Sequence, residues 1–207
     1  MNLFSKIFKN KDDKELDAKG NTEEYVTLIR IYLQSVMALQ LGITNLSYLP
    51  DLAKFKRTMG ITTVNGKVGV AEKSRARKIL SQYYGMSDSF FAEIEGSVKK
   101  NCKNINSLNS YFFQFQGFSN DLLLLMGNLM QWKFRVPSIF KSILKGMTEK
   151  TIHDILTKPN FKAVDVQKTA GNVRKYKETL GFSEAWIVEF VYNVIMLAKK
   201  EKKSDQK

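Results

Sequence analysis

The residues that could carry out catalysis or hold a metal ion are scarce in this chain. His153 is the only histidine and Cys102 the only cysteine among 207 residues, and neither has a companion at the spacing of a zinc site. A Ser-His-Asp triad would depend on His153, whose neighbours Glu149 and Asp154 are better explained as solubilising charges on a helix. We therefore expect no metal centre and no cofactor, and an enzyme is the less favoured class.

Other signs of enzyme chemistry are weak. Neither of the glycine-rich phosphate loops, G-x-G-x-x-G and G-x-x-x-x-G-K-[ST], occurs at any position. Pairs of acids at residues 12–13 and 23–24 leave open a Mg²⁺ or Ca²⁺ site made only of carboxylates. Such charges are also typical of a linker and of the first turn of a helix. A small helical enzyme with clustered carboxylates or hydroxyls remains an alternative.

Positive charge is abundant and unevenly distributed. The chain has 33 lysines and arginines against 20 acids, a net charge of +13. Residues 51–80 contain eight bases and two acids (+6), and residues 161–182 contain five bases and two acids (+3). This asymmetry indicates an anionic partner, such as an acidic protein, a nucleic acid, a phosphorylated ligand or an anionic membrane surface.

The first basic tract supplies the candidate binding site. On a helix, Lys73 and Arg77 are four residues apart and Arg75 and Lys78 are three apart, so two basic rows lie next to each other. If the segment before this helix folds back, the bases of an earlier short helix join them. The competing interpretation is a solvated helix face on a basic protein. The complete candidate site for an anion or a nucleic-acid backbone is Lys54, Lys56, Arg57, Lys73, Arg75, Arg77 and Lys78.

Two stretches have features of nucleic-acid-binding elements. Residues 77–96 have apolar and small residues at the spacing of a helix-turn-helix around Gly85. The helix that would enter a DNA groove, residues 87–97, carries three acids and no base, which is unfavourable among phosphates. Residues 132–135, WKFR, have the composition of a stacking surface, although packed aromatics beside extended basic side chains explain them better. Nucleic-acid binding is therefore an alternative and not the favoured function.

The two ends of the chain are expected to lie outside the folded domain. Residues 1–20 begin with a short stretch whose large apolar residues share one helical face, and they continue as a charged, flexible linker. The first part could bind an anionic membrane surface as a peripheral helix. We favour a frayed terminus that docks on the body of the protein. Residues 204–207 are expected to form a disordered tail.

The residues between these ends, 21–203, predict a single all-α domain. Apolar positions recur with the period of a helix in about nine or ten segments, which glycine, proline and capping residues separate. At the start of the first segment, Asn21 and Glu24 have the spacing of a capping box, and Gly42 is expected to end that helix. The chain is long enough to bury a large apolar core.

The only β signal lies in residues 61–70. Two β-branched runs flank Asn65-Gly66, which is the strongest short signal for a β-hairpin. An isolated two-stranded ribbon is only marginally stable, so an ordered loop is nearly as well supported. The sequence leaves both alternatives open.

Residues 118–137, FSNDLLLLMGNLMQWKFRVP, are the expected centre of the fold. Gly117 is predicted to end the preceding helix and Ser119 to cap the next one, as Gly181 and Ser183 do in a second Gly-Phe-Ser corner. A helix of about sixteen residues spans roughly 24 Å, less than the ~30 Å apolar core of a bilayer. We therefore expect a helix that is buried on all sides within the protein.

A family resemblance comes from two strings, FQGFSNDLLLLMGNLMQWKFRVPS and EFVYNVIMLAKK. They resemble helical hypothetical proteins from Bacteroides-like bacteria, which implies a bacterial, cytoplasmic setting and assigns no activity or site residue. The lone cysteine, which excludes an intrachain disulfide, suits a reducing compartment. The sequence thus predicts a non-catalytic cytoplasmic interaction protein that presents a basic face to an acidic partner. Binding to nucleic acid or to an anionic membrane surface is the alternative.

Overall fold

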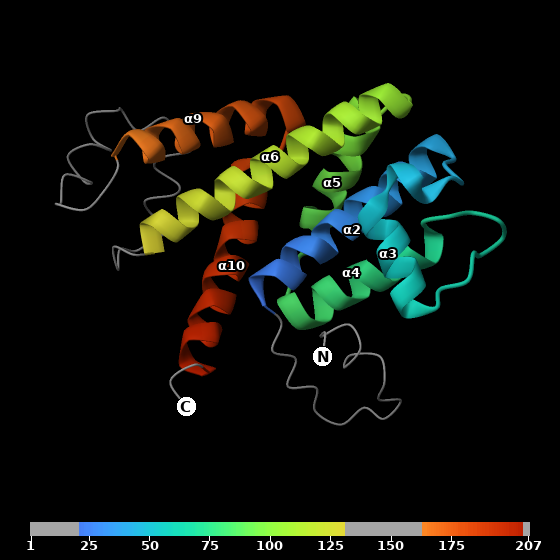
Figure 1. The fold of residues 1–207 in the computed structure, drawn as a ribbon, viewed down its shortest axis with the longest axis horizontal. Coiled ribbons are helices and arrows are strands. Elements are labelled where there is room, and N and C mark those ends of the chain that lie inside the picture. The colour runs from blue at the N-terminus through green and yellow to red at the C-terminus, as the bar shows by residue number, and fades with distance from the viewer. Residues whose placement is uncertain (1–20, 131–162, 205–207) are drawn as a thin grey trace. The chain divides into compact units, whose positions relative to one another are not determined.

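The computed structural model describes residues 21–130 and 163–204, and all the regular elements of these residues are helical (Figure 1). The all-α prediction is confirmed. The helices expected between residues 137 and 159, together with both predicted termini, lie outside the described residues. In chain order the elements are α2 (Thr22–Leu41), the 3₁₀ turn η1 (Leu46–Tyr48), α3 (Pro50–Met59), α4 (Val70–Tyr84), α5 (Asp88–Asn101), α6 (Ile105–Met130), α9 (Ala163–Leu180) and α10 (Glu184–Ser204).

The described residues belong to two compact units. The first contains α2 to α5, the start of α6 up to Asn109 and the end of α10 from Met196. The second contains the rest of α6, all of α9, and α10 up to Ile195. All seven candidate site residues lie in the first unit. The prediction of a single domain over residues 21–203 stays a prediction.

The first unit is built around α2, which contacts α3, α4 and α5 (Figure 1). The predicted capping box is present, because Glu24 N donates to Asn21 Oδ1 at 2.8 Å and Asn21 N donates to Glu24 Oε2 at 3.4 Å. Gly42 ends the helix in the left-handed conformation, as predicted. All residues from 31 to 38 are buried, so α2 is enclosed on every side along its middle turns.

Gly69 allows α4 to begin directly against α2. Its φ is 97°, and a Cβ at this position would lie 2.6 Å from the carbonyl oxygen of Ser35 and 3.2 Å from Cγ of Leu39. The N–H of Gly69 donates to Glu72 Oε2 at 2.9 Å, so this buried carboxylate caps the first turn of α4. Only glycine combines this backbone conformation with such close packing.

The predicted β segment is a tight turn within a loop. Asn65 and Gly66 both have positive φ, 50° and 69°, as a type I′ turn requires. Val64 forms an isolated antiparallel bridge with Lys67, and no strand extends from it in the described part of the chain. The residues on either side are taken up by the neighbouring helices, since Ile61 N donates to the last turn of α3. The ordered-loop alternative is therefore confirmed and the hairpin is wrong.

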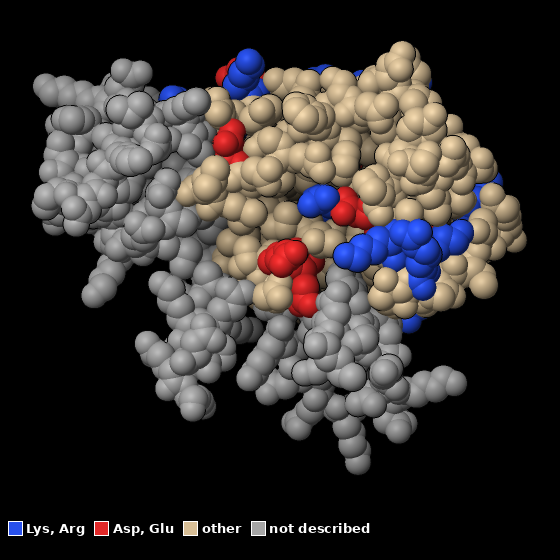
Figure 2. Space-filling model, viewed as in Figure 1, with Lys and Arg blue, Asp and Glu red and all other residues tan. Residues whose placement is uncertain are grey.

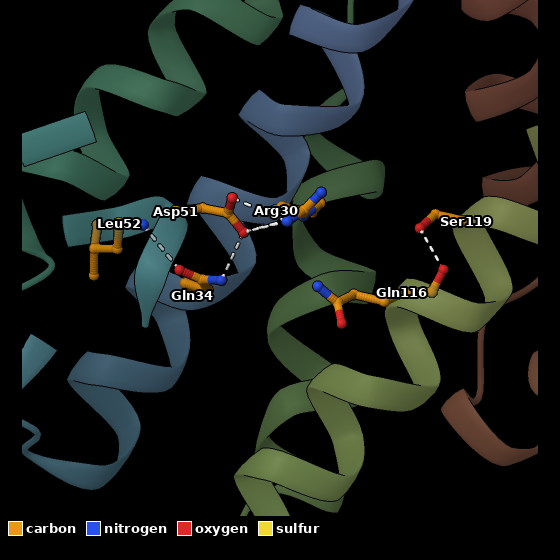
Figure 3. Close-up of polar contacts among 6 residues, drawn as sticks. All are labelled: Arg30, Gln34, Asp51, Leu52, Gln116 and Ser119. Carbon is orange, nitrogen blue, oxygen red and sulfur yellow. Dashed lines mark hydrogen bonds and ion pairs between the residues drawn. The ribbon is translucent and has the colours of Figure 1, made fainter. Parts of the chain in front are cut away.

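α6 runs without interruption through Gly117, where the sequence predicted the end of one helix and the start of another. Ser119 lies inside the helix, and its hydroxyl donates to the carbonyl oxygen of Gln116 at 3.0 Å (Figure 3). Glycine at position 117 serves helix packing instead, because a Cβ there would lie 2.7 Å from the hydroxyl of Tyr176 on α9. The predicted break is wrong, since a glycine can mark a close contact as well as a turn.

Aromatic side chains form the core of the second unit. Phe182 stacks on Trp186 with ring centroids 4.0 Å apart, and the Phe118 centroid lies 6.1 Å from each of them. Gly181, with a φ of 76°, follows the end of α9. The Oγ of Ser183 then accepts from Trp186 N at 3.1 Å. The second Gly-Phe-Ser corner is therefore confirmed.

The hydrophobic stretch at the centre of the sequence is unevenly buried. Phe118 and Leu122 are fully buried, whereas Leu124 is 61% exposed. Four consecutive leucines span a whole helical turn, so some of them must point away from any single packing partner. The prediction of a helix enclosed on every side is wrong for the part that the structure describes. None of the described helices combines the length and the apolarity that a membrane crossing requires.

Candidate anion-binding surface

The seven bases predicted as an anion site come from two helices of the first unit. Three lie on α3 and four on α4. The structure separates them into bases that pair with carboxylates of the same unit and bases that point into solvent. The two groups therefore have different functions.

Lys73 joins α4 to α5 and α2. Its Nζ lies 2.8 Å from Glu95 Oε1 and 5.9 Å from the ring centroid of Tyr32. The Tyr32 hydroxyl donates to the same carboxylate oxygen at 2.5 Å. Burial disfavours the charged form of Glu95, but the hydrogen bonds from Lys73 and Tyr32 outweigh it and hold the pKa of Glu95 below its ordinary value. Burial and this neighbouring carboxylate raise the pKa of Tyr32, so the phenol keeps its proton.

Arg77 repeats this arrangement one turn further along α4. Its Nη2 lies 2.8 Å from Asp88 Oδ1, and its guanidinium carbon lies 5.0 Å from the ring centroid of Phe91. α5, the helix that a helix-turn-helix would place in a DNA groove, thus uses its acids to bind the bases of α4. The row formed by Lys73 and Arg77 belongs to the packing between these helices.

Lys56 is the third base that points inward. Its Nζ donates to Thr63 Oγ1 and lies 3.9 Å from Glu72 Oε1. The Glu72 side chain is 1% exposed, so its charge is hidden beneath the loop. Lys56 therefore fixes the loop between α3 and α4, and we assign it a structural function.

The other acid of this tract, Asp51, is also held by its neighbours (Figure 3). Arg30 on α2 binds it with one edge of the guanidinium. Its Nη2 donates to Asp51 Oδ1 at 2.9 Å and its Nε donates to Asp51 Oδ2 at 3.0 Å. Gln34 Nε2 donates to Asp51 Oδ2 at 2.9 Å, and Gln34 Oε1 accepts from Leu52 N at 2.8 Å. A side chain of α2 thus caps α3, and the Asp51 charge is neutralised.

The remaining bases are exposed. Between residues 50 and 84, every exposed charged residue is a lysine or an arginine, and Lys54 lines a hollow together with the exposed Glu23 of α2. Figure 2 shows such side chains gathered around α3 on the visible face. In the described part of the chain, no carboxylate forms an ion pair with Lys54, Arg57 or Lys78. We call the exposed set the outer basic surface, and it comprises Lys54, Arg57, Lys67, Arg75 and Lys78.

Lys67 is the member that the sequence-based site did not include. It directly follows the Asn65-Gly66 turn and is exposed. The turn signal was readable in the sequence, and a residue at the tip of a loop is expected to face solvent. Lys67 belongs to the outer basic surface because of where the loop between α3 and α4 lies in the folded protein.

Two grooves meet at residues 60–61 and bring the two helices into one surface. One groove, of about 700 Å³, lies beside the end of α3 and is lined by Lys56 and Arg57. The other, also of about 700 Å³, lies between the loop and α4 and is lined by Arg75 and Lys78. The loop therefore places Lys56 and Arg57 of α3 and Arg75 and Lys78 of α4 beside two grooves that share residues 60–61.

The described residues offer little for catalysis or metal binding. They contain no group of three or more His, Cys, Asp or Glu side chains that could hold a metal ion. Cys102 is fully buried, and burial raises the pKa of its thiol to about 12, so it is protonated and inaccessible. His153 and residues 132–135 lie outside the described residues. The chemistry available at this surface is the attraction of anions.

The described residues define an all-helical protein whose first unit exposes five bases of α3, α4 and the loop between them. The family model described as "Domain of unknown function (DUF8491)" matches residues 1–206, and the chain belongs to this family. No curated protein matches the chain, and no solved structure matches it.

Proposed function

We propose that this protein is a non-catalytic cytoplasmic interaction protein whose outer basic surface binds an acidic protein. The observation that carries the proposal is the sorting of charge between residues 50 and 84. Asp51 and Glu72 are paired with Arg30 and Lys56, while every exposed charge in this range is positive. Such a surface attracts acidic partners over several ångströms and accelerates their association.

Exposed apolar side chains near the lysines and arginines favour a protein partner over a nucleic acid. Val64 and Tyr83 are large apolar residues, the first exposed in the loop and the second on α4. Apolar side chains surrounded by polar ones are typical of protein interfaces. A nucleic-acid backbone would instead be matched by bases with polar or stacking residues between them.

The test is a pull-down from a lysate of the source cell, with nuclease added and at two salt concentrations. Three forms of the full chain serve as bait: the wild type, an outer triple variant and a control triple variant that loses the same charge elsewhere. The outer variant carries Lys54→Gln, Arg57→Gln and Lys78→Gln. The control carries substitutions to Gln at three other exposed lysines, Lys99, Lys100 and Lys175.

The proposal predicts an acidic protein that the wild type and the control retain and that the outer variant loses. Its retention should fall as salt is raised, because exposed charges are screened. Equal retention by all three baits would contradict the proposal. Retention that nuclease abolishes would replace it with nucleic-acid binding, whose dependence on salt is steep.

A further inference from the structure

The groove between the loop and α4 combines apolar and basic residues in an open site. It has a volume of about 700 Å³ and runs from residues 60–64 of the loop along the outer face of α4 as far as Tyr83. Its apolar lining comes from Ile61, Val64, Ala71, Ile79 and Tyr83.

Two of these apolar side chains are unusually accessible. Val64 is 42% exposed and Tyr83 is 38% exposed. Val64 belongs to the loop and Tyr83 to the last turn of α4, and both line the groove. Apolar side chains that entered the groove would cover such residues and remove them from water, which is the main source of affinity at protein interfaces.

The charge of the groove is of one sign. Arg75 and Lys78 are both exposed members of its lining, and no Asp or Glu contributes to it. Glu72, one position from Ala71 in the lining, has its carboxylate buried and capping α4. A chain entering the groove therefore meets positive charge beside the apolar walls.

The wall formed by the loop is held in place from several directions. Lys56 donates to Thr63, and Ile61 N donates to Lys56 O at 3.1 Å. The bridge between Val64 and Lys67 closes the turn, with Lys67 N donating to Val64 O at 2.9 Å. A preformed wall lowers the entropic cost of binding.

We propose that this groove binds an acidic peptide segment of the partner protein, with a branched aliphatic or aromatic side chain against its apolar lining and flanking carboxylates at Arg75 and Lys78. The inference rests on the proposed function and specifies its partner. A peptide suits the groove better than a nucleic acid, because four of its five apolar lining residues are aliphatic and only Tyr83 offers a face for stacking a base.

The experiment is a selection of displayed random peptides on the full chain, followed by fluorescence titration of the enriched peptide. The inference predicts enriched sequences in which acids flank a branched aliphatic or aromatic residue. Replacement of that residue by alanine in the labelled peptide should weaken binding by about tenfold or more. A library that yields no enriched peptide, or only peptides without acids, would overturn the inference.

A matched pair of variants locates the site. The groove variant carries Val64→Ser and Tyr83→Ser, and the control carries Val70→Ser and Tyr48→Ser. The control removes the same two residue types at similar exposures, 38% and 41%, outside the groove lining. All four side chains are exposed, so both variants should keep the thermal unfolding midpoint of the wild type. The groove variant alone should lose the enriched peptide.

The outer triple variant separates failure of this inference from failure of the proposed function. If the outer triple variant loses the acidic peptide while the groove variant keeps it, the outer basic surface binds acidic chains and the groove does not. If both variants keep the peptide, the proposed function and the groove are both wrong. A labelled single-stranded RNA could also bind more tightly than the peptide and lose this binding in the groove variant. That result would overturn the peptide proposal and identify a nucleic acid as the ligand of the groove.

Discussion

Two carboxylates in the first unit are held in place by hydrogen bonds from a few neighbouring side chains. Glu95 receives hydrogen bonds from Lys73 and Tyr32, and Asp51 receives them from Arg30 and Gln34. Each acid lies on a different helix from the residues that bind it, so these contacts connect elements as well as neutralise charge. Their contribution to stability depends on the protonation of the carboxylate.

Glu95 should make stability depend on pH at the acidic end. Its pKa is lowered in the folded state, so its contribution is present above the unfolded value of about 4.3 and is lost as pH falls through the folded value. Glu95→Gln should therefore lower the free energy of unfolding in urea at pH 7, with a smaller deficit at pH 3. The exposed Glu178→Gln on α9 is the control and should change neither value. A deficit that is equal at both pH values would contradict the assignment.

Cys102 should behave as an inert thiol in the native protein. It is fully buried, and burial raises its pKa to about 12, so very little thiolate forms near neutral pH. A thiol reagent such as Ellman's should react slowly with the native chain and rapidly after unfolding in urea. Because the chain has 1 cysteine, the signal reports this residue alone. Fast, complete reaction without denaturant would show that the site opens.

At the scale of helices, boundaries set by local signals could be predicted from the sequence. The capping box of Asn21 and Glu24 and the glycines after α2 and α9 act within a few residues, and each is found where expected. Gly117 could not be assigned in this way. Its function depends on Tyr176, which is remote in the sequence, so local chemistry offers no means of distinguishing a packing glycine from a terminating one.

The contact between α6 and α9 can be tested through this pair. Within a helix, Gly→Ala ordinarily stabilises by about 1 kcal/mol. Gly117→Ala should gain less than this, because the new Cβ would lie 2.7 Å from the Tyr176 hydroxyl, which must move aside. With Tyr176→Ala already present, the same substitution should be stabilising by about 1 kcal/mol. Free energies of unfolding for the four chains of this double-mutant cycle provide the measurement, and additive effects would exclude the contact.

The positions of the candidate bases along the helices could be predicted from the sequence, but the directions of their side chains could not. The sequence indicated two basic rows on one helix and left open whether the segment before it folds back to bring the earlier bases beside them; the seven bases lie on α3 and α4. The direction in which each row points depends on the acids of α5 and on Glu72. The sequence alone therefore could not show that Lys78 is exposed while Lys73 pairs with Glu95, because this difference depends on how the helices pack.

At the scale of the whole molecule, which has a net charge of +13, the bases of α3, α4 and the loop between them fall into two groups. The inward bases form ion pairs with carboxylates or cover aromatic rings, whereas the outer ones are exposed. Exposed charges contribute little to stability. The two groups should therefore respond differently to neutralisation.

Two triple variants with equal loss of charge test this division. The outer variant, Lys54→Gln, Arg57→Gln and Lys78→Gln, should keep the thermal unfolding midpoint of the wild type or raise it slightly, because like-charge repulsion falls. The inward variant should lower the midpoint by several degrees, since it removes the cations that balance the buried Glu72 and the partly buried Glu95. The inward variant carries Lys56→Gln, Lys73→Gln and Arg77→Gln. Equal midpoints for the two variants would show that the division is wrong.

Gly69 also offers a way to study the protein inside a living cell. The atom that a new Cβ would strike is a main-chain oxygen of α2, which cannot swing aside as a side chain can. A chain with alanine at position 69 would keep every residue of the outer basic surface and would fail only through loss of its fold. Growth at low temperature would preserve it and warming would inactivate it. A strain with such a conditional allele would reveal, by what stops first on warming, the process in which the family takes part.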